Sequence, residues 1–122
     1  MSLDVYLNGD EVVECECHCG HVHTRKASSL YSANITHNMG RMADAAGIYE
    51  ALWRPVENGL TKARQLIEPL RVGLDRLKAN PAHFRQFNPA NGWGSYDVFV
   101  PWVESYLRAC EAHPDSDVSV WA

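Results

Sequence analysis

The sequence predicts an α+β fold, in which a small antiparallel sheet packs against about three amphipathic helices. Apolar and polar residues alternate near both ends of the chain, and three central segments carry apolar residues at three- and four-residue spacing. A length of 122 residues suits one domain spanning residues 1–122. We therefore expect N-terminal strands, a Cys/His hairpin and a C-terminal strand in one sheet, with the helices grouped on one side.

The strands are expected near the two ends of the chain. Residues 3–7 alternate before an Asn-Gly turn at 8–9, which is typical of a short strand. Residues 11–17 and 21–25 predict a hairpin. Alternation at residues 118–122 predicts a last strand, and we expect it to join the same sheet beside the first, because chain ends are ordered when something ties them down.

The first apolar stripe predicts a helix from about residue 36 to residue 53. Thr36 or Asn34 could cap its N-terminus, because either side chain can accept a hydrogen bond from the free N–H groups of the first turn. Pro55 should end it.

Two further stripes predict helices later in the chain. The second spans residues 60–77, where Pro69 predicts either a kink or two short helices. The third spans residues 99–110 and follows a glycine-rich loop, with Ser95 or Asp97 as its cap. Cys110 falls on the apolar face of this helix and is expected to be a small core residue.

Composition limits the possible classes of protein. A net charge of −4 argues against general nucleic-acid binding, which depends on clustered Lys and Arg. No apolar run is long enough to span a membrane, and the opening Met-Ser-Leu-Asp lacks the basic and apolar regions of a signal peptide. We expect a cytoplasmic protein without a membrane partner.

A cluster of possible metal ligands lies in the predicted hairpin. Zinc takes four thiolate or imidazole ligands, and a tight turn can bring several of them together. A reducing compartment favours metal binding over disulfides. We predict a structural zinc held by Cys17, Cys19 and one or both of His21 and His23, completed by Cys15 or by the remote His37. The alternative is a metal-free hairpin with reduced thiols, since no Cys-x-x-Cys pair is present.

Polar residues in three other places could hold a ligand. Polar residues crowd the predicted N-terminus of the first helix, where they could hold an anion. A Gly-Trp-Gly loop at residues 92–94 could shape a pocket. Arg54, between a tryptophan and a proline, could bind a carboxylate or phosphate. Ordinary capping, a tryptophan that plugs the core, and pairing of the arginine with Glu57 or Glu50 are the structural alternatives. The predicted ligand-binding residues are Asn34, His37, Asn38, Arg54, Asn91, Trp93 and Tyr96.

Three stretches of sequence together carry a family resemblance: the opening MSLDVYL, then YSANITHNMGRMADAAGIYEALWRP, and FNPANGWGSYDVFVPWVESYLRAC. The chain resembles an uncharacterised family of small proteins found in bacteriophages and in bacterial genomes that carry prophages. The resemblance implies a phage-related protein working in the host cytoplasm and carries over no catalytic residue. The Cys/His hairpin lies between the resembling stretches, which favours a structural over a catalytic role for its metal.

These observations leave three hypotheses for function. The first is a binding protein for a small polar or nucleotide-like ligand, or for a host protein. The second is a metal-dependent hydrolase, which is less economical because no nucleophile–His–Asp order, phosphate-binding loop or His-Glu-x-x-His motif is present. The third is a purely structural dimeric module, in which exposed strand edges or Trp121 pair across a two-fold axis.

Overall fold

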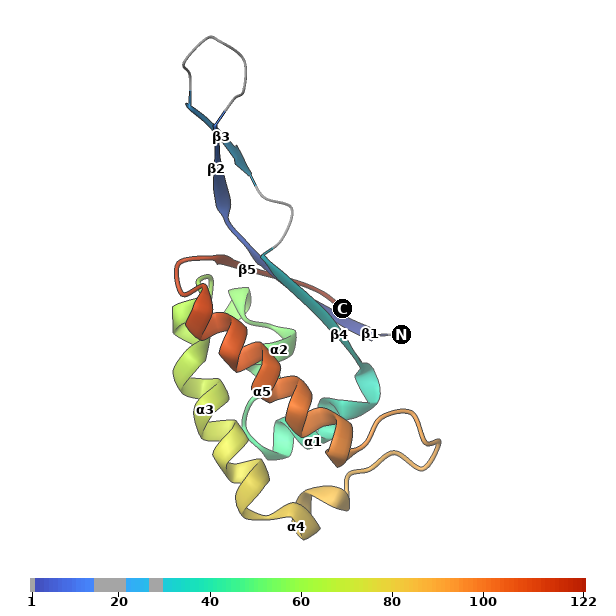
Figure 1. Cartoon of the computed structure of the whole chain (residues 1–122). Helices are drawn as coiled ribbons and strands as arrows, with labels where there is room; N and C mark the ends of the chain where they lie inside the picture. Colours follow the sequence, from blue (N-terminus) through green and yellow to red (C-terminus); the bar gives the residue numbers. More distant parts are fainter. Residues whose placement is uncertain (1, 15–21, 27–29) are drawn as a thin grey trace.

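A three-stranded antiparallel sheet lies against a layer of helices, as expected for an α+β fold (Figure 1). The computed structural model describes residues 2–14, 22–26 and 30–122. Strand β1 (Ser2–Asn8) is the middle strand, between β4 (Tyr31–Thr36) and β5 (Asp117–Trp121). The expected pairing of the first and last strands is confirmed.

The hairpin forms a sheet of its own. Strands β2 (Asp10–Glu14) and β3 (Val22–Lys26) pair with each other and, among the described residues, with no strand of the larger sheet. Our expectation that this hairpin belongs to the same sheet is corrected, since β4 occupies the second place beside β1. The pattern of a strand is present, since Tyr31, Ala33 and Ile35 alternate with Ser32, Asn34 and Thr36, but we did not recognise it because the run is short and leads directly into the predicted helix.

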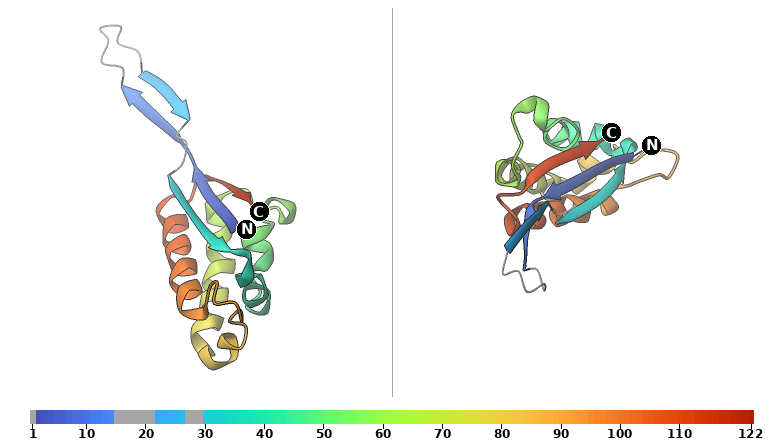
Figure 2. Two further views of the ribbon diagram at one scale, coloured as in Figure 1. Left: turned by 90° about the vertical axis from the view of Figure 1, so that its right-hand side faces the viewer. Right: turned by 90° about the horizontal axis from the view of Figure 1, so that it is seen from above.

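The two faces of the larger sheet differ because side chains alternate along each strand. Leu3, Val5 and Leu7 are completely buried against the helices. Asp4 and Tyr6 point to the opposite face and are partly exposed. In the right-hand view of Figure 2, the three strands lie in front of the helices, which leaves this outer face uncovered.

Two long helices form most of the helical layer. Helix α3 (Ala63–Ala79) stays one helix through Pro69, rather than dividing into two. Helix α5 (Tyr96–Ala112) begins where the side chain of Ser95 accepts a hydrogen bond from the Val98 N–H at 3.3 Å, which confirms the predicted cap. The shorter elements are η1 (His37–Met39), α1 (Gly40–Ala45), α2 (Tyr49–Trp53), η2 (Val56–Asn58) and α4 (Pro81–Arg85).

The prediction of one helix over residues 36–53 is wrong. The chain turns at Gly47, whose φ of 80° lies in the left-handed region that favours glycine. Arg76 of α3 holds the turn, because its Nη1 donates to the Ala46 carbonyl at 3.2 Å. Ile48 then packs so closely against Gly73 that a Cβ there would overlap its Cγ2. Tertiary contacts thus divide a stripe that looks continuous in sequence.

The buried apolar residues form one core cluster between the sheet and the helices. Tyr106 and Phe99 of α5 are its largest fully buried side chains, and the Tyr106 ring stacks on Tyr31 of β4 at 5.9 Å. Cys110 is completely buried, as predicted. Among the described residues, no helix is long and apolar enough to cross a membrane.

Candidate ligand-binding site

The candidate site begins where β4 runs into η1. The Thr36 hydroxyl accepts a hydrogen bond from the Asn38 N–H at 3.3 Å, which confirms Thr36 as a helix cap, although of a short 3₁₀ turn. Met39 at the end of this turn is fully buried. Capping and burial together fix the conformation of the two residues between them, His37 and Asn38.

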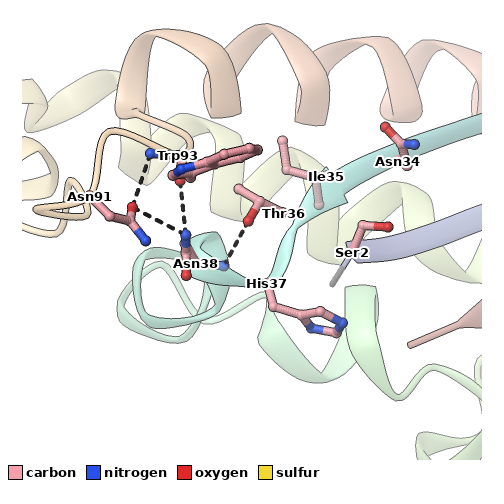
Figure 3. A pocket seen from close by; sticks show the side chains of 8 residues that line it. All are labelled: Ser2, Asn34, Ile35, Thr36, His37, Asn38, Asn91 and Trp93. Carbon is pink, nitrogen blue, oxygen red and sulfur yellow. Dashed lines mark hydrogen bonds between the residues drawn. The ribbon is translucent and has the colours of Figure 1, made fainter.

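Asn38 fastens this turn to the loop that precedes α5. Its Nδ2 donates to the Asn91 Oδ1 at 3.4 Å and to the Trp93 carbonyl at 3.2 Å (Figure 3). The Trp93 N–H in turn donates to the same Asn91 Oδ1 at 3.0 Å. One amide therefore joins two segments that are more than fifty residues apart in sequence.

Gly94 allows the loop to approach β4. Its φ is 93°, and a Cβ at this position would lie 2.7 Å from Thr36 Cγ2 and 3.0 Å from Met39 Cε. Any other residue would be strained by conformation and by contact at once. The fold therefore requires glycine at position 94 on grounds of space. A Cβ at Gly92, on the other side of Trp93, would meet no atom of the described residues.

Between β4 and this loop lies an open depression of about 580 Å³. It contains five of the seven predicted ligand-binding residues, from two distant segments. Ser2, Ile35 and Thr36 complete it. Ile35 and Thr36 lie between the predicted residues Asn34 and His37 in sequence, whereas Ser2 was missed, because only its pairing with Thr36 in the sheet brings it to the site. The lining residues are Ser2, Asn34, Ile35, Thr36, His37, Asn38, Asn91 and Trp93.

His37 is held in one tautomer by Trp53 of α2. The indole Nε1–H donates to His37 Nδ1 at 3.0 Å, so the proton of the neutral imidazole sits on Nε2. That Nε2 is buried and has no hydrogen-bond partner among the described residues. In Figure 3 the imidazole points away from the Trp93 indole. A buried donor without a partner costs roughly 1–3 kcal/mol of stability. A ligand atom that accepts a hydrogen bond from His37 Nε2 would remove this cost, which favours binding.

Two smaller depressions adjoin the same histidine. One, of about 430 Å³, lies against residues 86–90, which follow α4, and the other, of about 490 Å³, lies against α1 and α2. Arg41 lines both of them, but it does not line the larger depression. From the part of the chain that the structure describes, the larger depression therefore presents amide, hydroxyl, imidazole and indole groups without a lysine or an arginine.

Two predicted ligand residues do not join the site. The Arg54 guanidinium lies 3.8 Å from the Glu57 carboxylate, which is one of the pairings considered as its structural alternative. Tyr96 is buried, and its hydroxyl donates to the Leu77 carbonyl at 2.7 Å. Neither side chain lines any of the three depressions around His37.

The predicted zinc ligands lie almost entirely outside the described residues. This applies to Cys15, Cys17, Cys19 and His21, while His23 is described only as part of the backbone of β3. Over residues 2–14, 22–26 and 30–122, no group of three or more metal-ligating side chains occurs. The structural zinc stays a sequence-based prediction.

Comparisons of the chain with protein-family models, with curated proteins and with solved structures found no match. The resemblance to small bacteriophage proteins stays a prediction as well.

Proposed function

We propose that the protein is a small binding module, acting as a phage-type accessory factor in the host cytoplasm. Its ligand site is the depression between β4 and the Asn91–Trp93 loop. The observation that carries the proposal is the hydrogen-bonded fastening of that loop by Asn38, which brings five ligand-type residues from separate segments to one place.

The chemistry of the lining favours an uncharged polar ligand. Amide groups both donate and accept hydrogen bonds, so Asn34 and Asn91 suit hydroxyls, amides and the edges of nucleobases. Phosphate recognition relies on arginine, lysine or helix N-termini, and among the described residues no arginine or lysine lines this depression. Among nucleotide-like ligands, the site suits a nucleoside or free base better than a triphosphate.

Trp93 supplies the surface for stacking. Its side chain is 71% exposed although the backbone around it is fastened, so an indole face is available at low conformational cost. Stacking of a base on an aromatic side chain is worth about 1–3 kcal/mol. Trp93 should therefore contribute a substantial part of the binding free energy of a small planar ligand.

Isothermal titration and thermal shift with the four ribonucleosides and their monophosphates test the proposal. We expect at least one nucleoside to raise the melting temperature of the wild-type protein, and Trp93→Ala to weaken its binding by about tenfold or more. Trp121→Ala is the matched control, because Trp121 is 72% exposed on β5 and does not line the depression. Absence of any nucleoside binding, or equal binding to Trp93→Ala, would refute the nucleoside proposal.

A host protein is the second candidate ligand. The depression is open and runs along the exposed strand β4, so a polar side chain on an extended segment could enter it. Competition between a selected peptide and a bound nucleoside would show that the two share one site.

A further inference from the structure

The two edge strands of the three-stranded sheet, β5 and β4, differ in whether another segment hydrogen-bonds to their outer side. At β5, the Val118 N–H donates to the Thr61 carbonyl at 2.9 Å, and the Ala63 N–H donates to the Ser116 carbonyl at 3.0 Å. Lys62 also forms a β-bridge with Asp117. The segment before α3 therefore covers the Asp117–Val118 end of this edge. The opposite edge, at β4, has no strand partner among the described residues.

Strand β4 lacks the features that usually protect an exposed edge. Exposed edges commonly carry lysine, proline or a bulge, because their free N–H and C=O groups are a template for another strand. Tyr31–Thr36 contains no charge, no proline and no glycine, and its pairing with β1 runs without interruption from Thr36 to Tyr31. It presents six residues of regular strand.

Exposed apolar side chains stand at both ends of this strand. Leu30, immediately before it, is 42% exposed. Trp93 lies beside the other end, near Ile35 and Thr36 (Figure 3). In an antiparallel pair of identical strands, the beginning of one strand lies against the end of the other. The exposed leucine of each copy would then approach the exposed indole of the other.

We propose that β4 pairs antiparallel with β4 of a second copy of the chain, forming a six-stranded sheet across a two-fold axis. Each exposed Leu30 then lies beside the Thr36 end of the opposite copy and becomes a wall of its depression. The pairing stands on the exposed edge alone, whereas the role of Leu30 as a wall rests on the proposed function of that depression.

The side-chain pattern of β4 suits pairing with itself. Opposed residues in an antiparallel ladder share a face, so a register centred on Ala33 places Tyr31 opposite Ile35 on the inner face. On the outer face, Ser32 lies opposite Asn34. No charged residue meets another in this ladder, so two chains of net charge −4 can approach along it.

One strand pair buries a small area, so the dimer should be weak. Sedimentation velocity of the full chain, from about 5 µM to about 500 µM, measures it, with midpoints of association expected in the micromolar range. The mass should rise from the 13.7 kDa of one chain toward twice that value. A mass that stays at 13.7 kDa throughout overturns the proposal.

Variants identify the edge involved. Ser32→Lys places a lysine on the outer face of β4 and should weaken association by about tenfold or more. Ala79→Lys is the matched control, because it adds the same charge at the exposed C-terminal end of α3. Leu30→Ser should also weaken the dimer. A dimer that survives both edge variants but is lost in Trp121→Ala refutes pairing through β4.

The same variants separate this inference from the proposed function. Ser32 does not line the depression, so a monomeric Ser32→Lys protein can still be titrated with nucleosides. Nucleoside binding without any dimer of the wild-type protein refutes the pairing and leaves the ligand site. A dimer that is sensitive to Ser32→Lys but binds no nucleoside supports the pairing and refutes the nucleoside proposal.

Discussion

Asn38 is the residue on which the shape of the candidate site depends. Its side-chain amide holds the loop before α5 through two hydrogen bonds, and both partners belong to that loop. Asn38→Ala should therefore lower the free energy of unfolding by only about 1 kcal/mol, while amide exchange at residues 91–94 accelerates. Urea unfolding and hydrogen exchange measure the two effects.

Asn58→Ala is the control for this change. Asn58 also donates two side-chain hydrogen bonds, to Glu50 and to the Arg54 carbonyl, but both stay within residues 50–58, away from the loop before α5. It should leave exchange at residues 91–94 unaltered. If the amide hydrogens of residues 91–94 exchanged equally fast in the wild-type and Asn38→Ala proteins, the hydrogen bonds of Asn38 would not be what orders this loop.

Cys110 makes stability depend on alkaline pH. Burial, and then the nearby Glu111 carboxylate, raise the pKa of the Cys110 thiol to about 12. Below about pH 8 the thiol is protonated in folded and unfolded chains alike, so its contribution to stability is fully present. Between pH 9 and 12 only the unfolded chain ionises, so the free energy of unfolding falls by up to roughly 1.4 kcal/mol per pH unit.

Guanidinium unfolding at pH 7.5 and pH 10.5, compared with Cys110→Ala, isolates this contribution. The variant should lose less stability than the wild-type protein between the two values. It will still lose some, because burial also raises the pKa of Tyr106. An identical loss in both proteins would count against the thiol as a source of the effect.

At the scale of elements, two glycines in one loop provide a matched comparison. Gly92 and Gly94 both have positive φ, of 75° and 93°. A Cβ at Gly92 meets nothing, whereas one at Gly94 would press against Thr36 and Met39. Gly92→Ala should cost about 1 kcal/mol through backbone strain alone, and Gly94→Ala about 1–3 kcal/mol more.

Urea unfolding gives both values directly. Nucleoside titration should show a larger loss of binding for Gly94→Ala, because its loop can no longer lie against β4. Equal stability of the two variants would show that the loop does not need its close approach to the strand.

The hairpin carries a separate prediction. The β2–β3 register sets Glu14 opposite Val22, so the segment between them starts and ends on paired residues. We predict one zinc per chain by elemental analysis, and a lower melting temperature after chelation, because zinc binding contributes to folding free energy. Cys17→Ser should remove the metal, whereas Cys110→Ser should not. Purified protein without bound metal would contradict the prediction.

The sequence predicts an element well when neighbouring residues determine its structure, and poorly when contacts with distant segments do. Alternation in β1 and β5 and the Ser95 cap of α5 are local signals, and each prediction is confirmed. The break at Gly47 depends on contacts with Gly73 and Arg76 of α3, which are distant in sequence. The apolar stripe over residues 36–53 therefore gave no sign of the break.

The candidate site shows the same division. Asn38 and Asn91 were each expected to contact a ligand, because polar residues around helix starts and in glycine-rich loops form binding surfaces, but the sequence left open whether they converge. Tyr96 could not be excluded from the sequence, since its burial depends on the Leu77 carbonyl of another helix. The role of Arg54, as a ligand-binding residue or as a partner of Glu57 or Glu50, could not be decided either, because a single sequence does not show which carboxylate an exposed guanidinium contacts.

At the scale of the whole molecule, the sheet and the helices share one core. We therefore expect a single cooperative transition, in which far-UV circular dichroism and tryptophan fluorescence give the same urea midpoint. Trp53 is buried in α2 and reports on the core, while dichroism reports on all helices. Separate midpoints would show that residues 1–122 do not fold as the one domain that their length predicts.

The central position of β1 has a consequence for synthesis of the protein. Its partners are β4, which follows the hairpin, and β5, which follows every helix. On the ribosome, the strand that organises the sheet emerges before both of its partners and must wait for them. The chain therefore completes its sheet only after α5 has been translated, and until then Leu3, Val5 and Leu7 are open to chaperones.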